Sequence, residues 1–212
     1  MTPEQINENK QIYLDICRKH IQREGLEDLL NYLDKETDFF TAPSSSKFHM
    51  NEVGGLCHHS LNVFNTAVRV HQQILDIATN SEFIEKLEKI SLENIAVATL
   101  FHDLCKTNIY KVTEKWKKDN DNRWVSYSGY EVKDDLPFGH GEKSCFIVHR
   151  FMKLYKDELL AIRWHMGMFD LGENASPSRI AFYNALDQSP LTAIVHAADF
   201  LSTNCLEPTT KP

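Results

Sequence analysis

Apolar residues recur at three- and four-residue intervals along most of the chain, which is the spacing of amphipathic α-helices. The first such stretch runs from Thr2 to Glu24 and is expected to end at Gly25. A second, short helix is expected from Gly25 to Leu33, and the polar stretch 38–47 is typical of a loop. We therefore predict a helical N-terminal extension over residues 1–48, within a single domain of 212 residues.

The same spacing predicts further helices, and the polar ends of these helices carry most of the histidines. The predicted helices open at Cys57, run from Leu92 on to His102 and Asp103, lead from Pro137 to Tyr155, and cover 156–168 and 191–203. The segment 169–178 is predicted to be a loop, and the tail 207–212 is expected to be frayed.

One segment departs from this helical spacing. Between Asn108 and Val132, two runs rich in β-branched and aromatic residues flank a turn-forming polar cluster, which predicts an inserted β-hairpin. A third short strand at 130–132 is compatible with the pattern. The aromatic side chains of the hairpin segment could stack on a nucleic acid base, although packing on the sheet is the commoner role. They are Trp116, Trp124, Tyr127 and Tyr130.

The composition narrows the class of protein. Hydrophobic residues make up 42% and charged residues 25%, as in soluble globular proteins, and no apolar run is long enough for a membrane span. The polar N-terminus resembles neither a signal peptide nor a transit peptide. The five cysteines are odd in number and form no CxxC pair, so we expect reduced thiols and a cytoplasmic protein.

The net charge of −7 argues against a general nucleic-acid-binding surface. It still permits a small basic site, or a metal ion that screens an anionic substrate. The ten histidines are many for this length, and most lie in the segments expected to form the ends of helices.

The run Phe101–Lys106 combines a histidine, an aspartate and a lysine within five residues. The carboxylate of Asp103 suits a hard metal ion, the imidazole of His102 suits a transition metal, and Lys106 could meet an anionic oxygen. For this run alone, a polar helix end would be the simpler interpretation. Additional histidines and a distal aspartate on other predicted helices favour a metal site in the core of a helical bundle.

Two histidines lie close to candidate ligands and have to be distinguished from them. Adjacent helix positions diverge, so only one of His58 and His59 is expected to face a metal. His196 shares a face with Asp199 but lies in an apolar run, where a histidine more often hydrogen-bonds a carbonyl or a carboxylate than a metal. The candidate metal ligands are His59, His102, Asp103, His140, His165 and Asp199.

Three motifs, GGLCHHSLNV, FHDLCK and IVHAADFLS, together resemble the HD-domain superfamily of metal-dependent phosphohydrolases. The resemblance runs from about Val53 to Thr203 and implies an all-α HD-domain helical bundle, here with the inserted hairpin. It assigns His59, not His58, to the first motif, and it assigns a phosphate-contacting role to Lys106. The chain departs from the family pattern at Cys105, where glycine is common.

The resemblance also implies a set of metal ligands and a reaction. His59, His102, Asp103 and Asp199 would hold one metal; His140 and His165 would hold a second one bridged by Asp103, and His140 could also bind substrate. The ions expected are one or two of Mn, Fe, Ni, Co or Zn, with Mg as a further option. A metal-bound hydroxide would attack phosphorus, while the metal and Lys106 hold the developing charge.

The substrate implied is a nucleotide or a related small phosphorylated molecule. One alternative is a 3′-to-5′ exoribonuclease, because GGLCHHSLNV and RWHMG resemble the HD portion of that group; the acidic charge and the lack of a separate oligonucleotide-binding domain disfavour it. The other alternative is a metal-stabilised regulatory or binding module without turnover. The sequence leaves the oligomeric state open.

Overall fold

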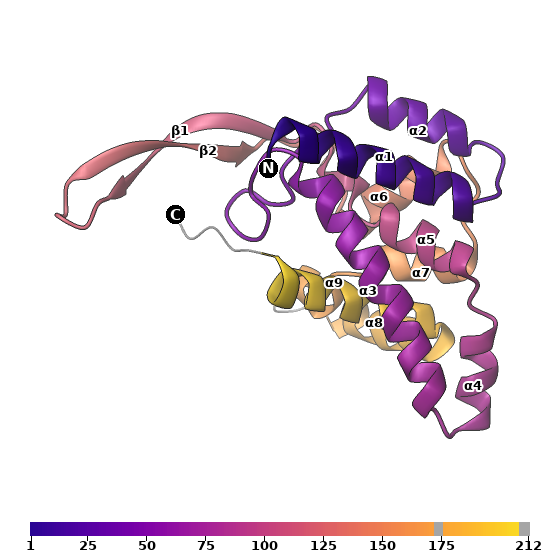
Figure 1. Ribbon diagram of the computed structural model, residues 1–212. Coiled ribbons are helices and arrows are strands. Elements are labelled where there is room, and N and C mark those ends of the chain that lie inside the picture. The colour runs from indigo at the N-terminus through magenta and orange to yellow at the C-terminus, as the bar shows by residue number, and fades with distance from the viewer. Residues whose placement is uncertain (172–175, 208–212) are drawn as a thin grey trace.

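A computed structural model describes residues 1–171 and 176–207 (Figure 1). The helices are α1 (Pro3–His20), α2 (Leu26–Lys35), α3 (Gly55–Ile77), α4 (Ser81–Glu88), α5 (Leu92–Leu100), α6 (His140–His149), α7 (Lys156–Trp164), α8 (Ser176–Gln188) and α9 (Pro190–Leu201). The strands are β1 (Tyr110–Lys118) and β2 (Trp124–Val132). The described residues also contain three short helical turns. Two are 3₁₀ turns, η1 (Leu104–Lys106) and η2 (Gly167–Asp170), and one is a π-helical turn, η3 (Ser202–Leu206).

The helical bundle is built around α3 and α5. The helix α3 packs against α1, α5 and α9, and α5 in turn contacts α1, α7 and α9. After its polar first turn, α5 is almost entirely apolar, and its residues Ile95–Leu100 are all buried, as expected of a helix surrounded by others. None of the helices in the described residues, the long α3 included, has the length and apolar character that a bilayer span requires.

The N-terminal extension belongs to the same hydrophobic core as the rest of the bundle. Tyr13 of α1 is fully buried among the rings of Phe39, Phe40 and Phe101. Its hydroxyl donates a 2.9 Å hydrogen bond to the carbonyl of Leu100, at the end of α5. This contact ties α1 to the turn that carries the His-Asp pair.

Gly25 lies at the start of the second helix, as predicted, but it does not end the first one. The helix α1 ends at His20, and Gly25 is the N-terminal cap of α2 with φ of 85°, a left-handed conformation that favours glycine. A Cβ atom there would come within 1.9 Å of the carbonyl oxygen of Phe151. The residue therefore permits close approach between the first helices and the segment after α6.

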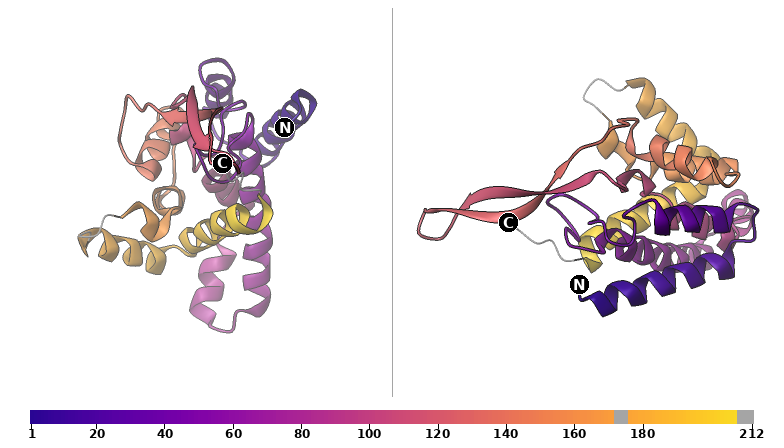
Figure 2. Two further views of the ribbon diagram at one scale, coloured as in Figure 1. Left: turned by 90° about the vertical axis from the view of Figure 1, so that its left-hand side faces the viewer. Right: turned by 90° about the horizontal axis from the view of Figure 1, so that it is seen from above.

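The predicted hairpin is present, with antiparallel pairing from Tyr110 opposite Val132 to Lys118 opposite Trp124. Residues 130–132 form the end of β2, so the suggested third strand is absent from the described residues. The hairpin extends well away from the helices (Figures 1 and 2).

Packing within the sheet explains only part of the aromatic content of the hairpin. Tyr110 and Tyr130 make an edge contact near the body, with ring centroids 6.2 Å apart. Trp116 and Trp124 are 58% and 64% exposed, so the packing role expected for these two is wrong.

Several helix boundaries differ from those predicted. The helix α5 ends at Leu100, so the His-Asp pair lies in a turn rather than on the helix. The helices α6 and α7 are shorter than predicted, and α9 gives way to the turn η3 at Ser202. The expected loop 169–178 contains the start of α8, a helix that buries only Phe182 and Ala185, while 172–175 lie outside the described residues.

We predict that Tyr13→Phe lowers the free energy of unfolding by about 1 kcal/mol, because it removes the donor to a buried carbonyl at the end of α5. Urea denaturation followed by circular dichroism measures the change. Tyr183→Phe is the control, since this tyrosine is 58% exposed. An equal loss in both variants would contradict the importance of the buried hydrogen bond.

Candidate metal centre

Four parts of the bundle bring five of the predicted site residues together. His59 lies in the second turn of α3, His102 and Asp103 lie in the turn after α5, His165 caps the end of α7, and Asp199 lies on α9. Four of the five are almost completely buried, and the Asp199 side chain is 14% exposed. The cluster lies at the centre of the bundle.

The histidines present the same ring atom to this centre. His59 Nε2 lies 3.2 Å from Asp199 Oδ1 and 3.3 Å from His102 Nε2. His102 Nε2 lies 3.3 Å from Asp103 Oδ2, and His165 Nε2 lies 3.4 Å from Asp103 Oδ1. Three imidazole nitrogens and two carboxylates thus surround one small volume, and overlapping sets of them are close enough to hold a metal ion.

Helix ends set the orientation of two of these rings. His102 Nδ1 donates to the carbonyl of Thr99 at 2.6 Å, and His165 Nδ1 donates to the carbonyl of Ile162 at 2.7 Å. Carbonyls in the last turn of a helix have no partner within the helix, so each can accept an imidazole N–H. With Nδ1 used in this way, Nε2 is the nitrogen available to a metal.

His59 is oriented by a carboxylate instead. Its Nδ1 donates to Glu207, with contacts of 2.9 and 3.1 Å to the two carboxylate oxygens. Glu207 also accepts hydrogen bonds from His49 Nδ1 at 2.5 Å and from Asn62 Nδ2 at 3.0 Å, and its side chain is fully buried. The prediction of a frayed tail is therefore wrong at Glu207, while 208–212 lie outside the described residues.

Lys106 is buried beside the cluster, with its ammonium 2.6 Å from Asp103 Oδ2. Burial disfavours the charged form of both groups, but their mutual attraction outweighs it. The charge of Asp103 keeps the pKa of Lys106 above its usual value. Lys106 together with His102 holds the pKa of Asp103 well below its usual range. Both groups are charged, and the ammonium faces the centre from one side.

The donor set fits a divalent cation. Among the residues that the structure describes, neither Asp103 Oδ1 nor His165 Nε2 has a hydrogen-bond partner, although both atoms are buried and face each other. Burial disfavours charge on His59, yet Asp199 and Glu207 outweigh it and raise the pKa of His59 to about 10. The buried carboxylates thus draw positive charge into the cluster, and a metal ion can supply that charge.

Comparison with protein families identifies a match to the HD domain over residues 56–204, which is more than half of the chain. The chain belongs to the HD-domain family. Comparisons with curated proteins and with solved structures found no match. The HD domain is typical of a superfamily of metal-dependent phosphohydrolases, and the buried His/Asp cluster agrees with metal binding.

Some groups of histidine and acidic side chains in the described residues lie close enough together to hold a metal ion. Of the predicted ligands, His140 alone belongs to none of these groups. It is half-buried at the first position of α6, with Nδ1 3.4 Å from the thiol of Cys105. The glycine after it permits a close approach of helices, because a Cβ atom on Gly141 would lie 2.3 Å from the carbonyl oxygen of Arg163. The departure from the family pattern at Cys105 is thus matched by a contact with His140.

The sequence predicts that His58 and His196 are not metal ligands, and their Nδ1 atoms have other partners. His58 Nδ1 contacts Asn9 Nδ2 at 3.0 Å, on the side of α3 that faces α1. His196 Nδ1 donates to the carbonyl of His165 at 2.6 Å, the kind of partner predicted for it. This bond supports the backbone of His165 within the HD domain.

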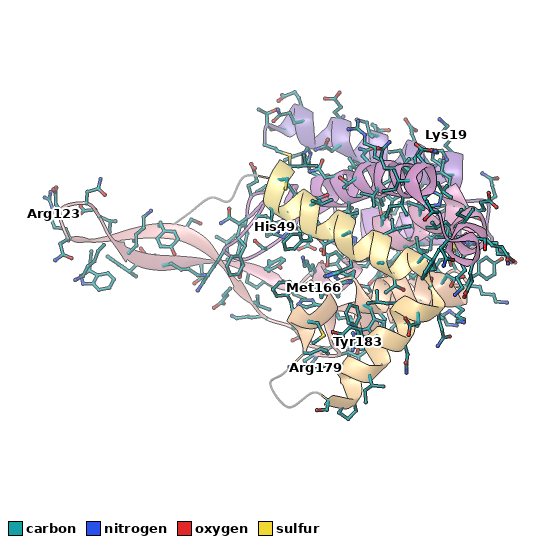
Figure 3. All side chains as sticks on the ribbon, turned by 90° about the horizontal axis from the view of Figure 1, so that it is seen from below. Lys19, His49, Arg123, Met166, Arg179 and Tyr183 are labelled. Atoms are coloured by element: carbon teal, nitrogen blue, oxygen red, sulfur yellow. The ribbon has the colours of Figure 1, made fainter. Side chains whose placement is uncertain are left out.

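Sequence reasoning missed His49 and Glu207, which lie outside the family match. Figure 3 shows His49 where the hairpin joins the helical body, and its ring contacts Glu207, a few residues after α9. The only local signal at Glu207 is an acidic residue shortly after the last apolar helix. Pairing it with a histidine 148 residues away requires the fold.

We expect Asp103→Ala to abolish metal binding, because it removes the carboxylate at the centre of the cluster, whereas His58→Ala should retain it. Metal analysis of the purified variants and calorimetric titration of the apo-proteins measure both effects. His59→Ala provides the matched comparison on the same helix. Loss of the metal in His58→Ala together with its retention in His59→Ala would reverse the assignment.

Proposed function

We propose that this protein is a metal-dependent phosphohydrolase that cleaves a phosphoester of a nucleotide or a related small phosphorylated molecule. The observation that carries the proposal is the convergence of three imidazole Nε2 atoms and two carboxylates beside the buried ammonium of Lys106. Such a centre joins a metal-binding donor set to a fixed positive charge. Phosphoester hydrolysis requires both an activated water and stabilisation of negative charge on the phosphoryl oxygens.

The proposed ligands of the first ion are His59, His102, Asp103 and Asp199, while His165 faces the other carboxylate oxygen of Asp103. This mixture of imidazole and carboxylate suits Mn, Fe, Co, Ni or Zn better than Mg, which prefers oxygen ligands and bound water. A divalent ion bound there would supply Lewis acidity and lower the pKa of water near the phosphate.

The side chains around the ligands support this chemistry. Lys106 is held by Asp103, so its ammonium needs no reorganisation to attract a phosphoryl oxygen. The carbonyls of Thr99 and Ile162 keep two imidazoles in one orientation and one tautomer. Most of the cluster is buried, which strengthens every electrostatic interaction within it.

The hairpin supports a second candidate substrate, a single-stranded RNA. Trp116 and Trp124 expose their rings on an arm that extends from the body, and Lys118 lies over the ring of Trp124. Exposed aromatic and cationic side chains are what single-stranded nucleic acid binds. The net charge of −7 opposes this candidate, so a small substrate remains the first choice.

The test is a screen of nucleotides, small phosphoesters and short RNA with added manganese, comparing the wild type with Lys106→Met. We expect phosphate release from a small substrate by the wild type and a loss of about 10²–10³-fold in kcat for Lys106→Met, because one fixed charge is removed from the transition state. Metal content should be retained in the variant. RNA cleavage alone would favour the second candidate, and binding without turnover would favour a regulatory module.

A separate prediction concerns the number of metals. We propose that His140 and His165 serve a second, weaker metal beside Asp103, so that titration of the apo-protein with manganese shows two classes of site. His140→Ala should remove only the weaker class, because His140 lies outside the central groups. If the wild type binds one ion at saturation, His140 is instead a substrate ligand or a proton donor to the leaving group.

A further inference from the structure

Glu207 lies beyond the residues matched to the HD domain, yet its side chain is fully buried against the candidate metal centre. The π-helical turn Ser202–Leu206 follows α9 directly and brings the chain back toward α3. Ser202 is buried and bonds Thr66 of α3 at 3.2 Å, which fixes the start of this turn. The segment after α9 is thus anchored before it reaches Glu207.

His59 needs an outside partner for its second ring nitrogen because of its place in the chain. His102 and His165 follow helix ends, where backbone carbonyls lack partners and accept their Nδ1 hydrogens. His59 lies well inside the 23-residue α3, where the carbonyls accept amide hydrogens of the same helix. The acceptor for His59 Nδ1 therefore has to come from another segment, and Glu207 supplies it.

Glu207 is itself held firmly. Asn62, one turn after His59 on α3, donates to Oε1, and His49 donates to Oε2. The two carboxylate oxygens thus accept from three side chains, which orients the carboxylate toward the imidazole of His59. Nothing in this arrangement uses His59 Nε2, which faces Asp199 and Asp103.

We propose that Glu207 is a positioning residue for the metal centre. It accepts the Nδ1 hydrogen of His59 and thereby presents Nε2 to the metal, so that the segment after α9 sets the metal affinity of a centre built from the preceding helices. The inference rests on the proposed role of His59 as a metal ligand. A carboxylate behind a ligating histidine fixes its ring and raises its basicity, and loss of such a partner weakens metal binding.

The trio of His49, His59 and Glu207 is also close enough to hold a metal ion itself. We favour the positioning role, because His59 Nδ1 and both oxygens of Glu207 already pair with one another and with their neighbours. Binding of an ion there would break these hydrogen bonds. The two roles predict opposite effects on the stoichiometry of metal binding.

The experiment compares the wild type with Glu207→Gln by calorimetric titration of the apo-proteins with Zn²⁺. Glutamine keeps the size of the side chain but loses the charge and one of the two acceptor oxygens. We expect the dissociation constant of the tighter site to rise about 10–100-fold, with its stoichiometry unchanged. In the zinc-loaded wild type, the Nδ1 proton of His59 should give a far-downfield NMR signal, which should move upfield in Glu207→Gln.

Glu158→Gln is the matched control. Glu158 is also a fully buried carboxylate, but it pairs with Arg23, whose guanidinium lies 2.5 Å away, and with Asn94. Its replacement should lower the melting temperature and leave the zinc affinity unchanged. Asn62→Ala is the second variant, since it loosens Glu207 without touching His59 and should cause a smaller loss of affinity in a folded protein.

The outcomes separate this inference from the proposed function. A wild type that binds no divalent metal overturns the proposed function. A wild type that binds zinc, together with unchanged affinity in Glu207→Gln and Asn62→Ala, overturns the positioning role. Loss of a whole equivalent of zinc in Glu207→Gln, with the tighter site intact, also overturns it and assigns the trio as a metal site of its own.

Discussion

The arrangement of the bundle depends on accommodating the carboxylate of Asp103 inside a protein core. An isolated buried carboxylate would be strongly unfavourable, and here it is compensated by the ammonium of Lys106 and by the imidazoles of His102 and His165. Each compensating group comes from a turn or a helix end. The helices therefore have to end where they do, and the positions of α5 and α7 follow from this requirement as much as from the packing of apolar side chains.

The three inward-facing histidines show one rule applied in two ways. A ring at a helix end uses the free carbonyls of that helix, as His102 and His165 do. A ring inside a helix lacks that option, and His59 depends on Glu207. The result is a set of equivalent Nε2 atoms held by backbone, or by a buried carboxylate, rather than by flexible side chains. This preorganisation is what a centre for metal and phosphate chemistry needs.

The sequence alone predicted the helical class, the hairpin and the order of the chemistry-bearing residues, because periodicity and motif order are local properties. It failed where distant residues decide the outcome. The close approach of Gly25 to the backbone of Phe151 has no signal in the local sequence, and the exposure of Trp116 depends on where the hairpin projects. Glu207 carries no local signal of its burial, and His140 could not be separated from the other candidate ligands without seeing its contact with Cys105.

The contact between Glu207 and His59 spans 148 residues of the chain. During synthesis on the ribosome, His59 is made long before Glu207, whereas the carbonyl partners of His102 and His165 are only three residues away from them in the chain. Contacts between residues so far apart also slow folding, because closing a long loop costs chain entropy. With Glu207 in the positioning role proposed above, tight metal capture would begin only once the chain has been extended to Glu207 and the turn after α9 has packed on α3.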